Sequence, residues 1–337
     1  MDSRRSPTPD QEQALDLFRS AGTFLLVGHA KPDGDCLGAQ AALGRGLTLL
    51  GKKVAIMNPD PPPAELAYLA RECPFGAYAA GPLPEHEVAV FLDFNELART
   101  GPMAGPLSSH SAKKLVIDHH PHHGIPFWDA AFVDVTASAT GLLVWRILRA
   151  LGGPVDSVVA AGVFTSIVTD TGWFRYSNTN AETLEVSAEL LRAGVDPSAV
   201  YSAIYQQRPA SEPRAIATLL GRVEYRGEGR IAVVEHPFGD PPADALADND
   251  PVLDILRSVA AVEVVLYLRE IERDVCKLSA RSKTNYDVNA LARRFGGGGH
   301  VKAAGATIRG RLGDVKERLI AAALEALEPR TVSAGRR

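Results

Sequence analysis

Histidine and aspartate gather in one short segment near the start of the chain, Gly28-His-Ala-Lys-Pro-Asp-Gly-Asp35, which follows an apolar run. The segment brings one imidazole, that of His29, together with the carboxylates of Asp33 and Asp35. Nitrogen and oxygen ligands of this kind suit hard or borderline divalent cations. Asp-Gly-Asp also occurs in solvated turns, but a histidine at the end of a predicted strand favours a metal site.

A third candidate carboxylate is Asp93, which ends the apolar run 87–93. In open parallel sheets, ligands bind beyond the carboxyl ends of the strands, so Asp93 is expected at the same edge as His29. The alternative is that Asp93 caps a short helix at 95–98.

The run from Lys114 ends in three consecutive residues of the metal-binding or catalytic type, Asp118, His119 and His120. Three such residues at the end of a predicted strand are a stronger signal than one. His122 and His123 follow closely, and for these two the alternative is a solvated loop.

Asp170 ends a predicted apolar helix within the sequence Val168-Thr-Asp-Thr-Gly172. A carboxylate is unfavourable at the C-terminus of a helix because the helix dipole is negative there. A cation beside Asp170 would offset this cost, which favours a metal ligand.

Six residues are therefore candidate metal ligands: His29, Asp33, Asp35, Asp93, His119 and Asp170. Six ligands exceed what one catalytic ion with open positions needs, and they suit two ions that share a carboxylate. The soft thiolate ligands typical of a structural zinc site are absent from these motifs. The histidines among the oxygen ligands favour two Mn²⁺ ions, with Mg²⁺ as the alternative.

A glycine-rich segment in the second half, Phe295-Gly-Gly-Gly-Gly-His300-Val-Lys-Ala-Ala-Gly305, is a candidate anion site. Glycines expose backbone N–H groups and permit positive φ angles, and His300 and Lys302 add donors. The alternative is a flexible loop. Arg281, at the end of a predicted strand, is suited to a bidentate phosphate contact, and its alternative is a solvated charge.

The elements that must position these residues form an α/β pattern. Short apolar runs alternate with helical segments, which predicts a parallel sheet with helices on both faces. The predicted strands are 23–29, 53–57, 87–93 and 114–118, and the predicted helices are 37–50, 140–151 and 156–169.

The pattern changes in the second half to hairpin-like strands mixed with helices, which predicts a smaller α+β domain. Strands are expected at 229–235, 261–269 and 274–281, and a helix at 288–295. The predicted division is a loose leader at 1–14, a catalytic domain at 15–191, a linker at 192–213, a substrate-binding domain at 214–328 and a tail at 329–337.

Composition bounds the class of protein. The 337 residues carry 36 basic and 40 acidic side chains, a formal net charge of −4, which argues against a polycation that binds long nucleic acid. The three cysteines are far apart and predict neither a disulfide framework nor a zinc site. Neither a signal peptide nor a membrane span is predicted, so we expect a cytoplasmic protein.

The motifs GHAKPDGD, FLD, VIDHH and VTDTG, in this order, resemble the four motifs of the Asp-His-His (DHH) phosphoesterase superfamily. The segments ARS at 280–282 and GGGGHVKAAG resemble the DHH-associated C-terminal domain. The resemblance covers about residues 15–328 and is greatest to the nanoRNase and pAp-phosphatase (bifunctional oligoribonuclease) subfamily. One departure is the second motif, FLDFNELARTG, where relatives often have a small hydroxyl residue soon after the aspartate.

The resemblance implies a role for each matching residue. His29, Asp33 and Asp93 would hold one Mn²⁺, while Asp35, Asp93, His119 and Asp170 would hold the other, so that Asp93 bridges. Asp118 would orient ligands, and His120 would face the substrate phosphate. Substrate would be held by residues that carry donors or expose backbone, namely Arg281, Ser282, Gly297, Gly298, Gly299 and His300. Arg99 is a further candidate phosphate contact, with a surface charge as the alternative.

The predicted function is metal-dependent hydrolysis of short RNA or DNA oligonucleotides, dinucleotides and 3′-phosphoadenosine 5′-phosphate (pAp), with a water activated between two ions. The substrate is expected in a cleft between the domains. One alternative is a cyclic or linear dinucleotide phosphodiesterase. Another, of a different class, is an inactive nucleotide- or RNA-binding protein, which would be expected to have lost ligands. A homodimer is compatible with the sequence, but nothing in it supports one.

Overall fold

A computed structural model describes residues 7–327, except 72, 123, 241–245 and 247–249. The chain divides into two compact units, Met1–Gln207 and Arg208–Arg337. The division lies inside the segment predicted as a linker, 192–213, most of which is helical here. Helix α1 (Pro9–Ser20) begins inside the predicted leader, and the predicted tail lies outside the described residues.

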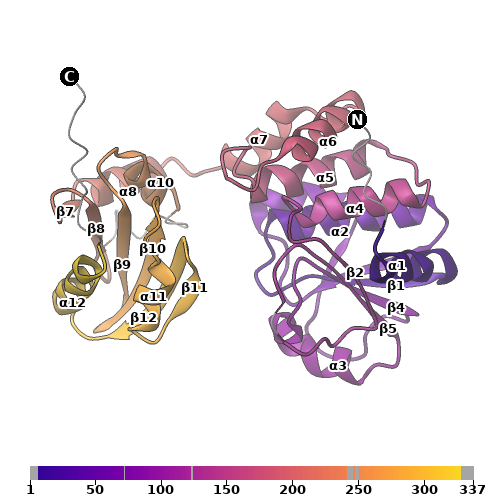
Figure 1. Ribbon diagram of the computed structural model, residues 1–337, viewed down its shortest axis with the longest axis horizontal. Coiled ribbons are helices and arrows are strands. Elements are labelled where there is room, and N and C mark those ends of the chain that lie inside the picture. The colour runs from indigo at the N-terminus through magenta and orange to yellow at the C-terminus, as the bar shows by residue number, and fades with distance from the viewer. Residues whose placement is uncertain (1–6, 72, 123, 241–245, 247–249, 328–337) are drawn as a thin grey trace. The chain divides into compact units, whose positions relative to one another are not determined.

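The first unit is an α/β structure built on six parallel strands in the order β3-β2-β1-β4-β5-β6 (Figure 1). The strands are β1 (Thr23–Val27), β2 (Lys53–Asn58), β3 (Phe75–Ala77), β4 (Val88–Leu92), β5 (Lys113–Asp118) and β6 (Ala130–Val133). The four predicted strands form with shifts of one or two residues at their ends. The edge strands β3 and β6 were not predicted, because they are only three and four residues long.

Helices cover both faces of this sheet, which confirms the predicted fold class. One face packs against α1, α2 (Gly34–Leu49), α4 (Thr140–Ala150) and α5 (Ser157–Asp170). The other face packs against the 3-10 helix η2 (Leu97–Met103) and α3 (Ala104–Ser109). The remaining helical elements of this unit are η1 (Ala64–Arg71), α6 (Ala181–Arg192) and α7 (Pro197–Tyr205).

The strand order places a topological switch point in the centre of the sheet. The chain runs outward from β1 through β2 to β3, and then returns to β4 on the other side of β1. The connections that follow β1 and β4 therefore diverge to opposite sides and leave space between them, which is where open α/β sheets bind ligands. His29 and Asp93 follow these two strands.

Helices α2 and α5 pack unusually closely because glycines face each other where they cross. A Cβ atom on Gly38 would lie 2.5 Å from the carbonyl oxygen of Gly162, and one on Gly162 would lie 2.7 Å from that of Gly38. An ion pair between Arg45 and Asp156, 2.7 Å from Nε to Oδ2, joins the same two helices. The antiparallel crossing brings the start of α2, with Asp35, to the end of α5, with Asp170.

These two helices are apolar because they are buried in the protein. Among the residues that the structure describes, none of the helices combines the length and the apolar character that spanning a bilayer requires.

The second unit is built on a mixed sheet in the order β11-β12-β10-β9-β8-β7. Its strands are β7 (Glu224–Arg226), β8 (Ile231–His236), β9 (Val264–Glu272), β10 (Val275–Ser282), β11 (Gly298–His300) and β12 (Ala303–Arg309). Helices α11 (Val288–Arg293) and α12 (Leu312–Glu325) pack on one face, and α8 (Glu212–Leu220) and α10 (Asp250–Ser258) pack on the other. The predicted hairpin forms between β9 and β10.

The glycine-rich segment is an ordered hairpin of β11 and β12, where the alternative interpretation expected a flexible loop. A Cβ atom on Gly297 would lie 2.1 Å from the carbonyl oxygen of Gly305, and Gly299 has a φ of +146°. Glycine is therefore required here for close approach of two backbones as well as for conformational freedom.

Because α2 and α5 cross so closely, one added methyl group at the crossing should destabilise the protein. We expect Gly38→Ala to lower the free energy of unfolding by about 1–3 kcal/mol, because the two backbones must separate. The control is Gly105→Ala in α3, where a Cβ atom would meet no atom within 4 Å and which should be neutral or slightly stabilising. Urea denaturation measures both, and equal stabilities of the two variants would contradict the prediction.

Candidate metal centre

The candidate ligands meet at the carboxyl edge of the first sheet, where they come from the ends of five elements. His29 follows β1, Asp93 follows β4 and His119 follows β5, while Asp33 and Asp35 lie at the start of α2 and Asp170 ends α5. Three sets of ligand atoms each lie within 4.8 Å of one another. These sets are His29, Asp33 and Asp93; Asp35, His119 and Asp170; and Asp93, His119 and His120.

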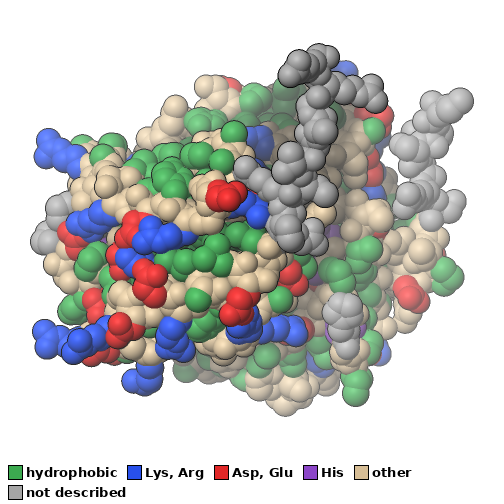
Figure 2. Space-filling model, turned by 60° about the vertical axis from the view of Figure 1, so that its left-hand side comes forward, with side chains coloured by type: hydrophobic (Ala, Val, Ile, Leu, Met, Phe, Trp, Pro, Cys, Tyr) green, Lys and Arg blue, Asp and Glu red, His purple; other side chains and the backbone are tan. Residues whose placement is uncertain are grey.

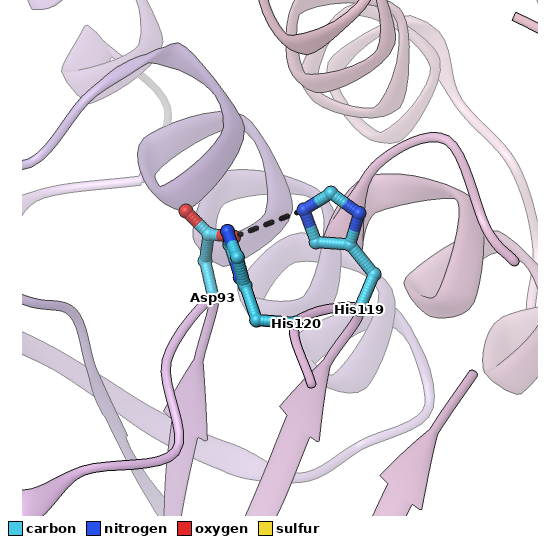
Figure 3. Close-up of side chains that lie close together, drawn as sticks. All are labelled: Asp93, His119 and His120. Carbon is cyan, nitrogen blue, oxygen red and sulfur yellow. Dashed lines mark ion pairs between the residues drawn. The ribbon is translucent and has the colours of Figure 1, made fainter. Parts of the chain in front are cut away.

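Asp93 is central because its two carboxylate oxygens face different sets. Oδ2 lies 3.5 Å from Nε2 of His29, whereas Oδ1 lies 3.7 Å from Nε2 of His119. Figure 3 shows the imidazoles of His119 and His120 directed toward this carboxylate from the end of the neighbouring strand. One carboxylate therefore borders two candidate cation positions.

The backbone of Asp93 is held in an unusual conformation. Its φ is +69°, in the left-handed region that non-glycine residues rarely adopt. Its N–H donates to the carbonyl of Ile117 at 3.0 Å, which extends the pairing of β4 with β5. Strain of this kind persists where the surrounding structure over-determines it, commonly at functional sites. The alternative prediction that Asp93 caps the following helix is wrong, because Glu96 occupies the N-cap of η2.

The carboxylate of Asp35 is fixed by a helix other than its own. It accepts hydrogen bonds from the backbone N–H groups of Thr140 at 2.9 Å and Gly141 at 3.2 Å, and from the hydroxyl of Ser166. Ala139, at the N-cap of α4, supplies no side-chain acceptor. Asp35 therefore caps α4 from α2, where the positive end of the helix dipole favours an anion.

The histidine tautomers follow from their hydrogen bonds. Nδ1 of His29 lies 2.9 Å from the carbonyl of Ala30, and Nδ1 of His119 lies 3.1 Å from that of Ala137. A carbonyl only accepts, so each Nδ1 carries a proton and the neutral ring has its lone pair on Nε2. This is the arrangement by which a metal-binding histidine is usually oriented.

The lone pair of His119 points into a group of carboxylates. Its Nε2 lies 3.5, 3.7 and 3.9 Å from oxygens of Asp35, Asp93 and Asp170. This nitrogen is buried and makes no hydrogen bond with any atom that the structure describes. A lone pair that faces three acceptors needs a cation between them, so these residues fit a divalent metal.

Crowding of the carboxylates changes their acidity. Burial, followed by the charge of Asp35, raises the pKa of Asp93 well above its usual range. The same two causes, in the same order, raise the pKa of Asp170 to about 7. Both shifts show that the negative charge here is costly without a compensating cation.

Asp118 has a different place from the other carboxylates. It is completely buried, and its Oδ1 accepts from the backbone N–H of His120 at 3.1 Å and from Nδ1 of the same residue at 2.8 Å. The hydrogen bond to Asp118 is the main cause that raises the pKa of His120. Asp118 therefore orients His120, whose Nε2 is left for another partner.

The loop that carries His29 is locked by a buried pair of amides. The N–H of Gly28 donates to Oδ1 of Asn58 at 2.7 Å, while the amides of Asn58 and Gln40 bond reciprocally at 2.8 and 2.9 Å. A Cβ atom on Gly28 would lie 2.6 Å from Sγ of Cys36. Glycine is thus needed before His29 for lack of space.

His122 differs from the solvated alternative. His122 is partly buried, packs against Trp128 and lies with Nδ1 3.3 Å from Oδ1 of Asn95. His123 lies outside the described residues. The ring of His122 is therefore part of the structure around Asp118 rather than a free loop side chain.

The candidate substrate residues lie in both units. Arg99, on η2, is exposed, and its carbonyl accepts from Ala30, beside His29. In the second unit, Ser282 is buried, and its N–H donates to the carbonyl of Lys302 at 3.0 Å. Arg281 is half-buried on β10. Residues 298–300 form β11, with Gly297 directly before it, and all four residues from 297 to 300 are partly or fully exposed.

Several polar residues at the centre were not predicted from the sequence. Thr140 donates from Oγ1 to Asp93 at 3.0 Å, Asn178 donates from Nδ2 to Oδ2 of Asp170 at 2.9 Å, and Ser166 donates to Asp35. The only sequence signal is their position near helix ends or ligand motifs. Their roles depend on contacts between segments that are distant in sequence.

Comparison with known proteins agrees with the geometry. The model of the DHH family, N-terminal domain, matches residues 23–191, and that of the DHHA1 domain matches 247–329. A bifunctional oligoribonuclease and PAP phosphatase NrnA from Thermus thermophilus is 34% identical over 91% of this chain and 90% of its own. The protein of the same name from Bacillus subtilis is 25% identical over 85% of this chain and 89% of its own.

A solved structure shares the architecture of both units. The exopolyphosphatase-related protein from Bacteroides fragilis has a TM-score of 0.85 and 26% identity, and the match covers 93% of this chain and 95% of that chain. With the family models and the relative that is 34% identical over most of its length, the chain belongs to the DHH family of phosphoesterases.

Proposed function

We propose that the protein is a manganese-dependent phosphoesterase that hydrolyses short oligonucleotides and 3′-phosphoadenosine 5′-phosphate. The observation that carries this proposal is the carboxylate of Asp93, whose Oδ2 faces one set of ligand atoms and whose Oδ1 faces another. Two cation positions that share one carboxylate are typical of enzymes that hydrolyse phosphate esters.

The ligands divide into two sets in this proposal. His29, Asp33 and Asp93 would hold one divalent cation. Asp35, His119 and Asp170, together with Asp93, would hold the other. When bound, the two cations lower the pKa of a water and offset the charge that develops on the phosphate oxygens. The two imidazoles among the oxygen ligands favour Mn²⁺ over Mg²⁺.

The remaining residues act on the substrate. His120 donates a hydrogen bond from Nδ1–H to Asp118, which leaves Nε2 to neutralise a phosphate oxygen or to transfer a proton. The raised pKa of His120 supports this role, because it favours the protonated ring. Asp118 keeps the ring in one orientation.

Short substrates are favoured by the charge of the protein and by its relatives. On the molecular face shown in Figure 2, basic and acidic side chains are interspersed with apolar ones. This face and the net charge of −4 differ from the broad basic surface that a long nucleic acid needs. Relatives named bifunctional oligoribonuclease and PAP phosphatase support both substrates. Arg281, Ser282, Gly297–Gly299 and His300 would bind the nucleotide, with Arg99 on the phosphate.

The proposed metal centre predicts that the stability of the folded protein depends on pH and on bound Mn²⁺. Asp93 and Asp170 have raised pKa values, so the folded, metal-free protein holds protons that the unfolded chain releases. Its stability should fall as the pH rises from about 4 through about 7. Mn²⁺ at a hundredfold excess over its dissociation constant should add about 2.7 kcal/mol at pH 8, and less at pH 5, where protons compete.

Thermal unfolding with and without Mn²⁺ measures this effect. Asp93→Asn should lose the shift, since an amide is a poor bridge, although asparagine tolerates the left-handed backbone. The exposed Asp16→Asn should keep the shift. An equal shift in Asp93→Asn and the parent would exclude this centre as the binding site.

The proposed function predicts that the protein releases mononucleotide from a dinucleotide in the presence of Mn²⁺. The double variant Asp118→Ala with His119→Ala should lose more than about 100-fold of this rate, since it removes both a ligand and the residue that orients His120. Lys113→Ala, at the opposite end of β5, is the control. Full activity of the double variant would refute the site.

The same assay separates the candidate substrates. Rates on oligonucleotides of increasing length give the length preference, and phosphate release from 3′-phosphoadenosine 5′-phosphate tests the second activity. Faster turnover of a cyclic dinucleotide would favour the alternative phosphodiesterase, and binding without turnover would favour a regulatory protein.

If Arg281 binds a phosphate of the substrate, its replacement should weaken substrate binding. Arg281→Ala should raise KM about 10- to 100-fold, because charge-assisted hydrogen bonds to phosphate are lost. Arg281→Lys should recover little, since lysine lacks the bidentate fork. Arg273→Ala, in the exposed turn between β9 and β10, removes the same charge and should leave KM unchanged. A KM that follows charge alone would argue against a specific contact.

A further inference from the structure

Asn95 is a buried polar side chain beside the candidate metal centre, only 8% exposed, and it is not one of the candidate ligands. Its amide nitrogen donates to Oδ2 of Asp118 at 2.7 Å and to the carbonyl of His120 at 3.2 Å. Its amide oxygen lies 3.3 Å from Nδ1 of His122. The amide nitrogen also lies 3.5 Å from the carbonyl of Pro121. Asn95, which follows β4, therefore contacts four residues at the end of β5 and in the loop after it.

The surroundings allow only one orientation of this amide. Both the carboxylate of Asp118 and the carbonyl of His120 are acceptors, so the NH₂ group must face them. The oxygen then faces His122, whose Nδ1–H donates to it. A flipped amide would place an oxygen 2.7 Å from the carboxylate of Asp118.

This contact completes the hydrogen bonding of a carboxylate that is cut off from water. Asp118 is 0% exposed, and its Oδ1 is used by His120. Asn95 is the side chain that holds Oδ2. A buried carboxylate that loses a donor either reorients or takes up a proton, because an unpaired charge is expensive there.

We infer that Asn95 is a positioning residue that fixes the direction of His120. It acts in two ways, by holding the Asp118 carboxylate so that Oδ1 faces Nδ1 of His120, and by bonding the backbone carbonyl of His120. The inference rests on the proposed function for the meaning of that direction, which is the presentation of Nε2 to the substrate.

Asn95→Asp is the sharpest variant because it keeps the shape of the side chain and replaces the donor by an acceptor. Two carboxylates would then face each other where the 2.7 Å hydrogen bond is. The exchange variant Asn95→Asp with Asp118→Asn restores a donor opposite an acceptor and has the net charge of the parent. Asn95→Ser supplies a hydroxyl donor in a smaller side chain.

Steady-state kinetics on a dinucleotide with Mn²⁺ is the first test. We expect Asn95→Asp to lower kcat about 10- to 100-fold with little change in KM. The exchange variant should exceed both of its single variants, as coupled residues do, and Asn95→Ser should recover part of kcat. Equal kcat of Asn95→Asp and the parent would overturn the inference, as would an exchange variant no better than the worse single variant.

The second test needs no substrate. At one fixed pH, the Nδ1–H of His120 in ¹⁵N-histidine-labelled protein should show the hydrogen bond to Asp118 in the parent and in the exchange variant, and lose it in Asn95→Asp. His120→Gln assigns the signal. If the parent hydrolyses no nucleotide, the proposed function fails, while this signal still decides the role of Asn95. If Asn95→Asp does not fold, Asn95→Ala, which removes the donor without adding a charge, gives the same comparison, and an unchanged signal in the folded variant contradicts the inference.

Discussion

Repulsion among clustered carboxylates is the constraint around which the first unit is built. Asp35, Asp93 and Asp170 all face Nε2 of His119, and water screens them little, because Asp35 and Asp93 are buried and Asp170 is partly buried. The fold offsets part of this cost with fixed donors, namely the N-terminus of α4 on Asp35, Thr140 on Asp93 and Asn178 on Asp170. These donors orient the oxygens but leave their charge, so burial and the charge of Asp35 still raise the pKa values of Asp93 and Asp170.

Close approach of backbones is how the fold brings such groups together. Gly38 and Gly162 let α2 and α5 cross at a distance that any side chain would prevent, and a Cβ atom on Gly141 would lie 2.1 Å from Oγ of Ser166. The packing of three helices is thereby coupled to the position of one carboxylate, that of Asp35. Stability and ligand geometry consequently depend on the same glycines.

The neighbouring residues His119 and His120, which follow β5, have different hydrogen-bond partners, and Asp118 is the partner of His120. His119 directs its lone pair at the carboxylates, whereas His120 donates a hydrogen bond from Nδ1 to Oδ1 of Asp118. Consecutive residues beyond a strand can point in such different directions because the chain has left the regular pleat. The surrounding amides and carbonyls, rather than the residue types, distinguish the two imidazoles.

The sequence by itself determined the fold class, the positions of the four central strands and the residue types at their ends, because apolar runs and strand-end polar residues are local features. The short edge strands β3 and β6, the β11–β12 hairpin and the contacts of Asn95, Thr140, Ser166 and Asn178 were decided only by the tertiary structure. Glycine-rich sequence is equally compatible with a loop and with two closely packed strands, and only the partner strand selects between them. Likewise, which nitrogen of a histidine is free, or which oxygen of Asp93 faces which neighbour, depends on hydrogen-bond partners that lie far away along the chain.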